Sequence, residues 1–169
     1  EITTVHGIRV VTLQRLMLDM ARLRPAGESL VVTDAALRTL TGATRFRQEE
    51  AQLRAAPIIA NVLERLGQMK GATGLPRARE VLRCTNPLSE SFGESRMKWI
   101  ALALGFPEPV AQKLVTVDGQ DYYLDLWIKE LKAGFEFDGL LKYDTTTSQG
   151  RDAFIREKRR DDHLMSAGL

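Results

Sequence analysis

The stretch DYYLDLWIKELKAGFEFD, residues 121–138, decides how we interpret the fold of this chain. Two apolar runs, Tyr122–Ile128 and Ala133–Phe137, flank a polar turn at Lys129–Lys132, and this pattern predicts an antiparallel hairpin. A turn of even length places the apolar side chains of both strands on one face of the sheet and the acidic side chains on the other.

The predicted register brings carboxylates together. Asp125 lies opposite Glu136, with Asp138 two residues further along, while Leu126 faces Phe135 on the core side. Like charges across a strand pair are destabilising by roughly 0.2–1 kcal/mol, so we expect a compensating partner, for which a hard divalent cation is a candidate. The alternatives are a solvated acidic face and a turn of odd length, which would move Asp125 away from Glu136.

The composition is that of a globular protein, since 44% of the 169 residues are hydrophobic and this suffices for one packed core or two small ones. No apolar run approaches the roughly 20 residues of a membrane span, so we expect a cytoplasmic protein with no membrane partner. Cys84 is the single cysteine, which excludes an internal disulfide. With only two histidines besides, any bound metal is expected to have oxygen ligands.

The charge is unevenly distributed along the chain. Residues 1–87 contain 13 Lys and Arg against 8 Asp and Glu, a net charge of +5, and the remainder contains 11 against 14, a net charge of −3. A basic part beside an acidic part suits a protein that grips a polyanion with one and collects cations with the other, although it also fits an ordinary solvated surface.

Hydrophobic periodicity divides the chain near residue 86. Residues 1–86 are expected to form a mainly helical region, which begins with a short strand at Val5–Val11. The positive net charge of this region is the basis for expecting it to act as a linker or DNA clamp. Pro57 is expected to kink a long helix or to start a new one. The helices expected in this part cover approximately residues 12–23, 28–40, 47–69 and 76–83.

Residues 87–169 show a different pattern. A helix over residues 92–104 is expected to precede three antiparallel strands and a final helix over residues 151–167. The strands are expected at residues 111–117, 121–128 and 132–138. The chain begins at Glu1 rather than at Met, and a glycine that would cap the last helix stands next to the final residue, so we expect a further segment on each side.

Four short segments carry a family resemblance: SFGESR (91–96), YLDLW (123–127), FEFDGLLKY (135–143) and EKRRDDHLMSAG (157–168). In this order they resemble the PD-(D/E)XK nuclease superfamily. More narrowly, they are similar to the very-short-patch-repair-endonuclease-like domain of unknown function found C-terminal to AbiEi-like antitoxin domains in actinobacteria. VHGIRVVTLQRLMLDMA (5–21) also resembles the segment that precedes this domain.

The resemblance implies an α+β fold. The mainly helical region of residues 1–86 would be followed by a restriction-endonuclease-like mixed sheet flanked by helices in residues 87–169, with the final strand missing. An open sheet edge would then be available to a partner protein or to a second copy in a homodimer.

The resemblance also implies a catalytic site. Asp125 and Glu136 would bind Mg²⁺ or Mn²⁺, with Glu94 as a third ligand from the helix and Asp138 as a further one. Asp138 stands where the superfamily usually has lysine, so either Lys142 takes over that role or hydrolysis is impaired. A basic cluster would contact the backbone of a nucleic acid; its members are Lys158, Arg159 and Arg160.

Several of these residues have structural alternatives. Ser91-Phe92-Gly93-Glu94 matches the S-x-x-E capping box, in which Glu94 would only bond back to the Ser91 backbone. Lys142 fits an unpaired surface lysine, and the charged run 157–162 fits a solvated helix face. Tyr123 and Trp127 share the face of Asp125 and are candidates for base stacking, with core packing as the alternative.

Three functions are compatible with these residues. The first is a Mg²⁺-dependent endodeoxyribonuclease that hydrolyses DNA phosphodiester bonds in phage defence, repair or mobile-element biology. The second is a catalytically degenerate DNA-binding transcriptional regulator or antitoxin of the AbiEi type. The third is a protein-interaction domain that uses the open sheet edge.

Overall fold

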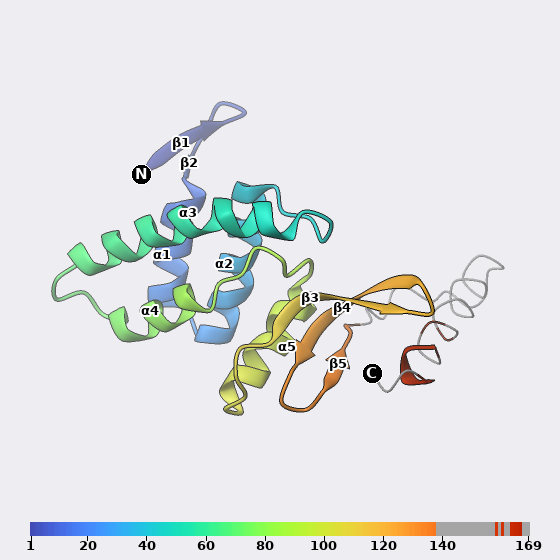
Figure 1. Cartoon of the computed structure of the whole chain (residues 1–169). Helices are drawn as coiled ribbons and strands as arrows, with labels where there is room; N and C mark the ends of the chain where they lie inside the picture. Colours follow the sequence, from blue (N-terminus) through green and yellow to red (C-terminus); the bar gives the residue numbers. More distant parts are fainter. Residues whose placement is uncertain (138–157, 159, 161–162, 167–169) are drawn as a thin grey trace, which may run out of the picture.

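The computed structural model describes residues 1–137, 158, 160 and 163–166, and Figure 1 shows how the elements are arranged. The elements in chain order are β1 (Ile2–Val5), β2 (Ile8–Val11), α1 (Leu13–Leu23), α2 (Ala26–Thr41), α3 (Gln48–Gln68), α4 (Leu75–Arg83), α5 (Phe92–Ala103), β3 (Val110–Val117), β4 (Gln120–Ile128) and β5 (Ala133–Phe135). Residues 158, 160 and 163–166 are also helical. The α+β class predicted from the sequence is confirmed.

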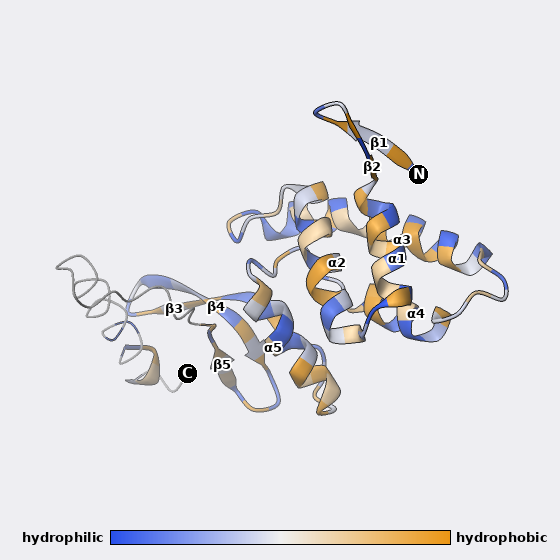
Figure 2. Cartoon of the chain, turned by 180° about the vertical axis from the view of Figure 1, so that it is seen from behind, coloured by the Kyte–Doolittle hydropathy of each residue, from blue (hydrophilic) through white to orange (hydrophobic). Residues whose placement is uncertain are grey.

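Helix α2 is the centre of the helical part, because it contacts α1, α3, α4 and α5. Its fully buried Leu30 and Leu37 join Met17 of α1, Val62 of α3 and Leu82 of α4 in one apolar cluster. Burying one such side chain contributes about 1.5–3 kcal/mol. These buried residues give the bundle a core of its own, and Figure 2 shows orange, apolar residues along α2.

One prediction for the first part of the chain needs correction, and one alternative that the sequence left open is excluded. The strand expected at Val5–Val11 is instead the antiparallel hairpin of β1 and β2, which turns at His6 and Gly7. Both residues have positive φ, as a type I′ turn requires, and His6 carried no turn pattern that would have shown this in the sequence. Pro57 lies inside α3, which continues as a single helix, so a new helix does not start there.

The three-stranded sheet has the order β3-β4-β5 and is antiparallel throughout the described residues, so the predicted mixed sheet is not present in that part. Leu126 pairs with Phe135, which confirms the predicted register and the even turn. The last strand is shorter than the predicted 132–138 and ends at Phe135. The reason is that the Phe137 amide donates to a carboxylate oxygen of Asp125, at 2.9 Å, instead of extending the ladder.

A buried ion pair joins the helical bundle to the part of the chain that carries the sheet. Lys98 of α5 and Asp34 of α2 are 0% and 1% exposed, and the closest contact between their charged atoms is 2.8 Å. Asp34 also accepts hydrogen bonds from the Ser95 hydroxyl and the Asn86 amide, and the Cys84 carbonyl accepts one from Lys98. The pair crosses the predicted boundary at residue 86, and the division into two domains stays a prediction.

None of the helices in the described part of the chain has both the length and the hydropathy of a bilayer-spanning segment.

Replacing Asp34 with alanine is expected to destabilise the protein by roughly 3–5 kcal/mol, because Lys98 would stay buried without its counter-charge. Urea unfolding followed by circular dichroism measures the change. The control is the double variant Asp34→Leu/Lys98→Met, which removes both charges and is expected to regain most of the lost stability. A loss below about 1 kcal/mol in the single variant, typical of an exposed pair, would contradict this role.

Candidate functional site

The predicted carboxylates come from three different elements. Glu94 lies in the first turn of α5, Asp125 lies in the middle of β4, and Glu136 follows the last residue of β5. Glu94 is buried, and Asp125 and Glu136 are partly exposed. The structure brings Glu94 and Asp125 together and gives Glu136 a separate partner.

Glu94 both caps its helix and faces the sheet. The Ser91 hydroxyl accepts a hydrogen bond from the Glu94 amide at 3.2 Å, which is one half of the predicted capping box. The Glu94 carboxylate, however, accepts from the amide of Glu90 at 2.8 Å, one residue before the position that the box requires. The same oxygen, Oε2, also accepts from the side chain of Gln112 at 2.9 Å.

Asp125 is held by two donors. Its Oδ2 accepts from the Phe137 amide, and its Oδ1 accepts from Nε2 of Gln112 at 3.3 Å. One amide group of Gln112 therefore serves both Glu94 and Asp125, and an oxygen of each carboxylate lies within 3.3 Å of the same nitrogen atom. This bridge is the centre of the candidate site.

Glu136 is bound by a residue that the sequence assigned to nucleic acid. Arg160 donates from both terminal nitrogens to the two carboxylate oxygens of Glu136, and it also donates to the Tyr123 carbonyl at 3.1 Å. Such a bidentate pair is stronger than a simple charge contact. Lys158 is exposed. Three other predicted site residues lie outside the described part of the chain: Asp138, Lys142 and Arg159.

A polar hollow of about 260 Å³ opens beside the carboxylates. Its lining residues are Arg45, Asp121, Tyr122, Tyr123, Asp125, Glu136 and Arg160. An adjoining hollow of about 430 Å³, at the start of α3, shares Arg45 and Tyr123 with it. The two hollows therefore offer a ligand both acidic and basic groups.

An aromatic side chain projects at the border of these hollows. Phe46 is 77% exposed, and its ring packs edge to face against Tyr123 with 5.7 Å between the centroids. The guanidinium of Arg45 lies 5.9 Å from the Tyr123 centroid. We call Arg45, Phe46 and Tyr123 the aromatic rim. Trp127, the other stacking candidate, packs instead against the apolar cluster of Tyr122 and its neighbours.

Arg45 forms a salt bridge with the carboxylate of Glu90, which also pairs with Arg38. Burial acts to raise the pKa of Glu90, but the two arginines outweigh it and lower that pKa. Glu90 consequently holds in place the loop that carries Arg45 and Phe46 of the aromatic rim. Its own backbone amide donates to Glu94, so the loop and the start of α5 are connected through one residue.

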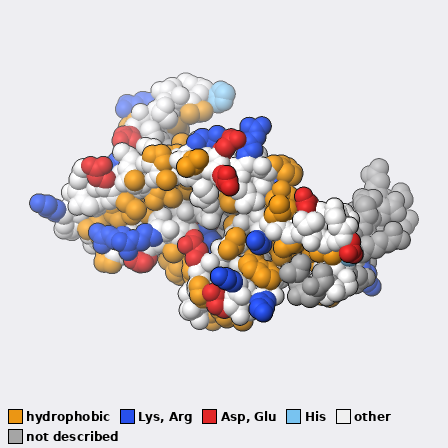
Figure 3. All heavy atoms as spheres, viewed as in Figure 1, with side chains coloured by type: hydrophobic (Ala, Val, Ile, Leu, Met, Phe, Trp, Pro, Cys, Tyr) orange, Lys and Arg blue, Asp and Glu red, His pale blue; other side chains and the backbone are white. Residues whose placement is uncertain are grey.

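The basic groups of the helical part do not form one continuous patch on the face drawn in Figure 3. Lys and Arg side chains, in blue, are interspersed with Asp and Glu, in red, on that face. The positive net charge of residues 1–87 is thus spread over the surface there and is not concentrated in a groove.

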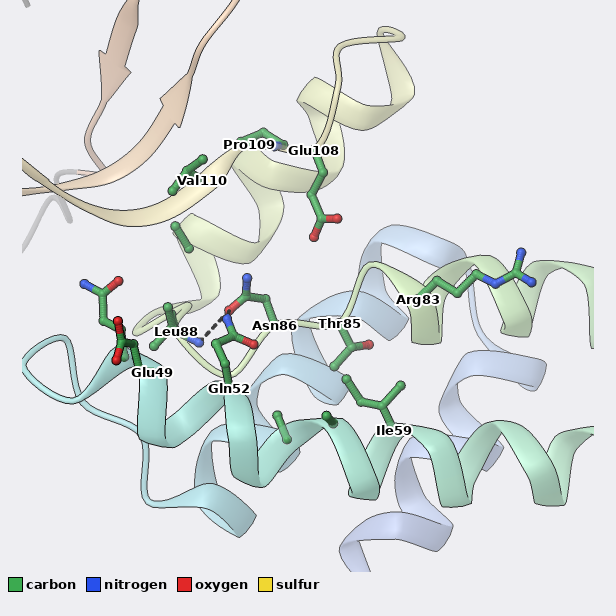
Figure 4. Close-up of a pocket in the computed structure, with 14 residues that line it drawn as sticks. Glu49, Gln52, Ile59, Arg83, Thr85, Asn86, Leu88, Glu108, Pro109 and Val110 are labelled. Carbon is green, nitrogen blue, oxygen red and sulfur yellow. Dashed lines mark hydrogen bonds between the residues drawn. The ribbon is translucent and has the colours of Figure 1, made fainter.

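A larger hollow, of about 720 Å³, lies between α3 and the segments around Asn86 and Pro109 (Figure 4), and neither Glu94 nor Asp125 lines it. Gln52 and Asn86 present amides to it, while Ile59 and Val110 present apolar surface. None of the predicted site residues that the structure describes lines this hollow, and we assign no role to it.

The donor set of the site fits a hard cation. Glu94 and Asp125 supply carboxylate oxygens, and Mg²⁺ is usually held by one or two carboxylates together with phosphate oxygens and water. Within the described residues no group of three or more His, Cys, Asp or Glu side chains is arranged to hold a metal. The fit is therefore to a two-carboxylate site, in which Glu136 is engaged elsewhere by Arg160.

Gln112 is the functional candidate that sequence reasoning missed. It is 0% exposed on β3, and its φ of 50° is unusual for a residue other than glycine. A glutamine in an apolar strand directly across from Asp125 was the only available indication in the sequence. It gave no sign of the positive φ or of the contact with Glu94.

Comparisons of the chain with models of protein families, with curated proteins and with solved structures found no match.

The pH dependence of stability tests the environment of Glu94. Burial raises the pKa of Glu94 above its ordinary value of 4.5, and the charge of Asp125 raises it further, against the hydrogen bond from the Glu90 amide, which lowers it. A carboxyl group whose pKa is higher in the folded than in the unfolded protein stabilises the fold while it is protonated. This contribution is fully present below the pKa of the unfolded state and is lost as the pH rises through the pKa of the folded state.

We therefore expect the stability of the wild type, relative to Glu94→Gln, to fall as the pH rises from about 4 toward neutrality. Urea unfolding of both proteins over a pH series measures the difference, and the comparison cancels the titration of all other groups to first order. A difference that stays constant with pH, or that increases in favour of the wild type, would contradict the raised pKa.

Proposed function

We propose that this chain is a metal-dependent endonuclease-like domain that acts on DNA phosphodiester bonds. The observation that carries the proposal is the Glu94–Asp125 pair, in which carboxylates from the start of a helix and the middle of a strand share one buried amide donor. The resemblance to the PD-(D/E)XK superfamily supports the same two residues as metal ligands, together with a restriction-endonuclease-like fold.

The residues of the site have distinct roles in this proposal. Bound Mg²⁺ or Mn²⁺ would supply an activated water and neutralise charge on the phosphate. Asp125, oriented by the Phe137 amide, and Glu94, oriented by the Glu90 amide, hold the ion. Arg45 presents positive charge beside the hollow, where a phosphate of the substrate would lie. Asp138 is proposed as a further metal ligand. Lys142 is proposed to take the role of the lysine that the superfamily usually has at the position of Asp138.

The aromatic rim supports a nucleic acid as the ligand. An exposed aromatic ring beside arginine is the combination on which unpaired bases stack while the backbone is neutralised. Phe46 and Arg45 provide it next to the hollow that contains Asp125. We infer that the rim holds a base of the strand whose phosphate reaches the carboxylates.

A second candidate function is the catalytically degenerate DNA-binding regulator or antitoxin. The bidentate pairing of Glu136 with Arg160 favours it, because a carboxylate engaged in this way is not a ready metal ligand. Under this proposal the lysines and arginines of the chain bind DNA, and the DNA is not cleaved. Docking of a partner protein or a second copy at the sheet edge stays a separate prediction, as does a cytoplasmic location.

Nicking of supercoiled plasmid in Mg²⁺ or Mn²⁺ tests the nuclease. Asp125→Asn is expected to lower the rate at least about 100-fold. Loss of a residue that only supports a metal ligand already costs up to about 100-fold, and Asp125 is proposed to be a ligand itself. Glu136→Gln distinguishes whether this residue takes part once DNA is bound. The control is Asp118→Asn, whose side chain is 86% exposed in the turn between β3 and β4. Equal DNA binding by all four proteins without cleavage would favour the regulator.

Affinity for a single-stranded oligonucleotide in EDTA tests the aromatic rim separately from catalysis. Phe46→Ala is expected to weaken binding by about 1–3 kcal/mol, the usual contribution of one base stacked on an aromatic side chain. Leu53→Ala is the matched control, because Leu53 is 76% exposed on α3 and lies outside both hollows. Equal affinities of the two variants, measured by fluorescence anisotropy, would remove the rim from the interface.

A further inference from the structure

Gln112 lies in an unusual backbone conformation for its place in the sheet. Its neighbours Ala111 and Lys113 pair with Leu126 and Leu124 of β4, but no such pairing joins Gln112 to Asp125, which lies directly across. The φ of Gln112 is 50°, in the left-handed region that residues with a Cβ enter only at a cost in free energy. The surrounding contacts must therefore hold this residue in place.

Two sets of contacts hold Gln112. Its main-chain carbonyl, turned away from β4, accepts a hydrogen bond from the side chain of Gln48 on α3 at 2.8 Å. Its side-chain nitrogen donates to both Glu94 and Asp125. A primary amide has two N–H bonds, so this nitrogen is fully used by the two carboxylates.

The other end of the same amide is unused. Oε1 of Gln112 is buried and has no hydrogen-bond partner among the described residues. Buried polar atoms are nearly always paired, and an exception calls for an explanation such as a missing ion. The amide thus combines a satisfied nitrogen, aimed at two acids, with an unsatisfied oxygen, the atom type that hard cations bind.

The two ends of this amide suit two different states of the carboxylate pair. Ionised carboxylates only accept hydrogen bonds, so without a cation the amide must present its nitrogen to them. A hard cation bound by the acids would take oxygen ligands and would repel an N–H group at the same place. A half-turn about the last side-chain bond of Gln112 exchanges the two atoms and leaves the backbone unchanged.

We propose that Gln112 is a cation-responsive ligand of the Glu94–Asp125 pair: its nitrogen bridges the acids in the cation-free protein, and its Oε1 coordinates the ion when one binds. This inference rests on the proposed metal site. The unusual backbone of Gln112 is consistent with it, because the residue with positive φ is the one whose side-chain nitrogen reaches both acids.

A neutral side chain is important at this position. A glutamate at position 112 would place a third negative charge beside Glu94, whose pKa burial and Asp125 already raise. Such a change would favour cation binding through added charge and would repel the acids when no cation is present. Methionine has a similar length and can neither donate to the carboxylates nor supply an oxygen.

Binding of Mn²⁺ alone, followed by the electron paramagnetic resonance signal of the free ion, tests the proposal on the complete chain. Gln112→Met is expected to weaken Mn²⁺ binding at least about 10-fold, Gln112→Glu to bind at least as tightly as the wild type, and Asp125→Asn to lose the site. Urea unfolding of each variant checks that it is folded.

The outcomes separate the two proposals. Loss of binding in Asp125→Asn together with unchanged or tighter binding in Gln112→Met would overturn the role of Gln112 and leave the metal site standing. Absence of Mn²⁺ binding by the wild type would overturn both. Weakened binding in Gln112→Met with retained binding in Gln112→Glu would support the oxygen of residue 112 as a ligand.

A measurement on the wild type avoids any dependence on variants. The side-chain NH₂ resonances of Gln112 are expected to move on titration with Mg²⁺, since the group leaves its two carboxylate acceptors. The matched control is the side-chain amide of Gln52, which bonds to Asn86 outside the site and is expected to stay unchanged. Mg²⁺ binding without a shift at Gln112 would show that the amide does not turn.

Discussion

The buried ion pair between Asp34 and Lys98 joins α5, the helix that carries Glu94, to α2 of the helical bundle. Lys98 and Glu94 are four residues apart on α5, so they lie on the same side of that helix. Anchoring Lys98 to α2 therefore determines the position of Glu94 with respect to the bundle. Taking two charges out of water is costly and is offset only by good geometry and further hydrogen bonds. Ser95, Asn86 and the Cys84 carbonyl provide those bonds.

A close contact between Gly93 and Phe137 joins the start of α5 to the end of the hairpin of β4 and β5. A Cβ added to Gly93 would lie 2.1 Å from the ring of Phe137, so only glycine allows this contact. The contact places Phe137 where its amide donates to Asp125. The residue before Glu94 and the residue after Glu136 thus work together to orient Asp125. The short SFGE segment has a steric role as well as a capping role.

The electrostatics of the site follow from how each acid is compensated. Glu136 has a bidentate arginine, Glu90 has two arginines, and Glu94 and Asp125 share a neutral amide. Of these four acids, Glu94 and Asp125 therefore have the weakest charge compensation, and burial together with the charge of Asp125 raises the pKa of Glu94. A cation entering this region gains most by binding at that pair. The proposed metal site and the proposed role of Gln112 depend on the same imbalance.

The sequence alone determined the local features of this protein. Alternating apolar and acidic residues fixed the hairpin of β4 and β5 and its pairing of Leu126 with Phe135, because a strand has a period of two. Ser91 fixed the start of α5 through its cap. The tertiary structure decided which groups meet. Three contacts join residues that are distant in the chain: the bond from Gln112 to Glu94, the pairing of Arg160 with Glu136, and the Asp34–Lys98 pair. Such contacts depend on the packing of whole elements, which short-range periodicity does not specify.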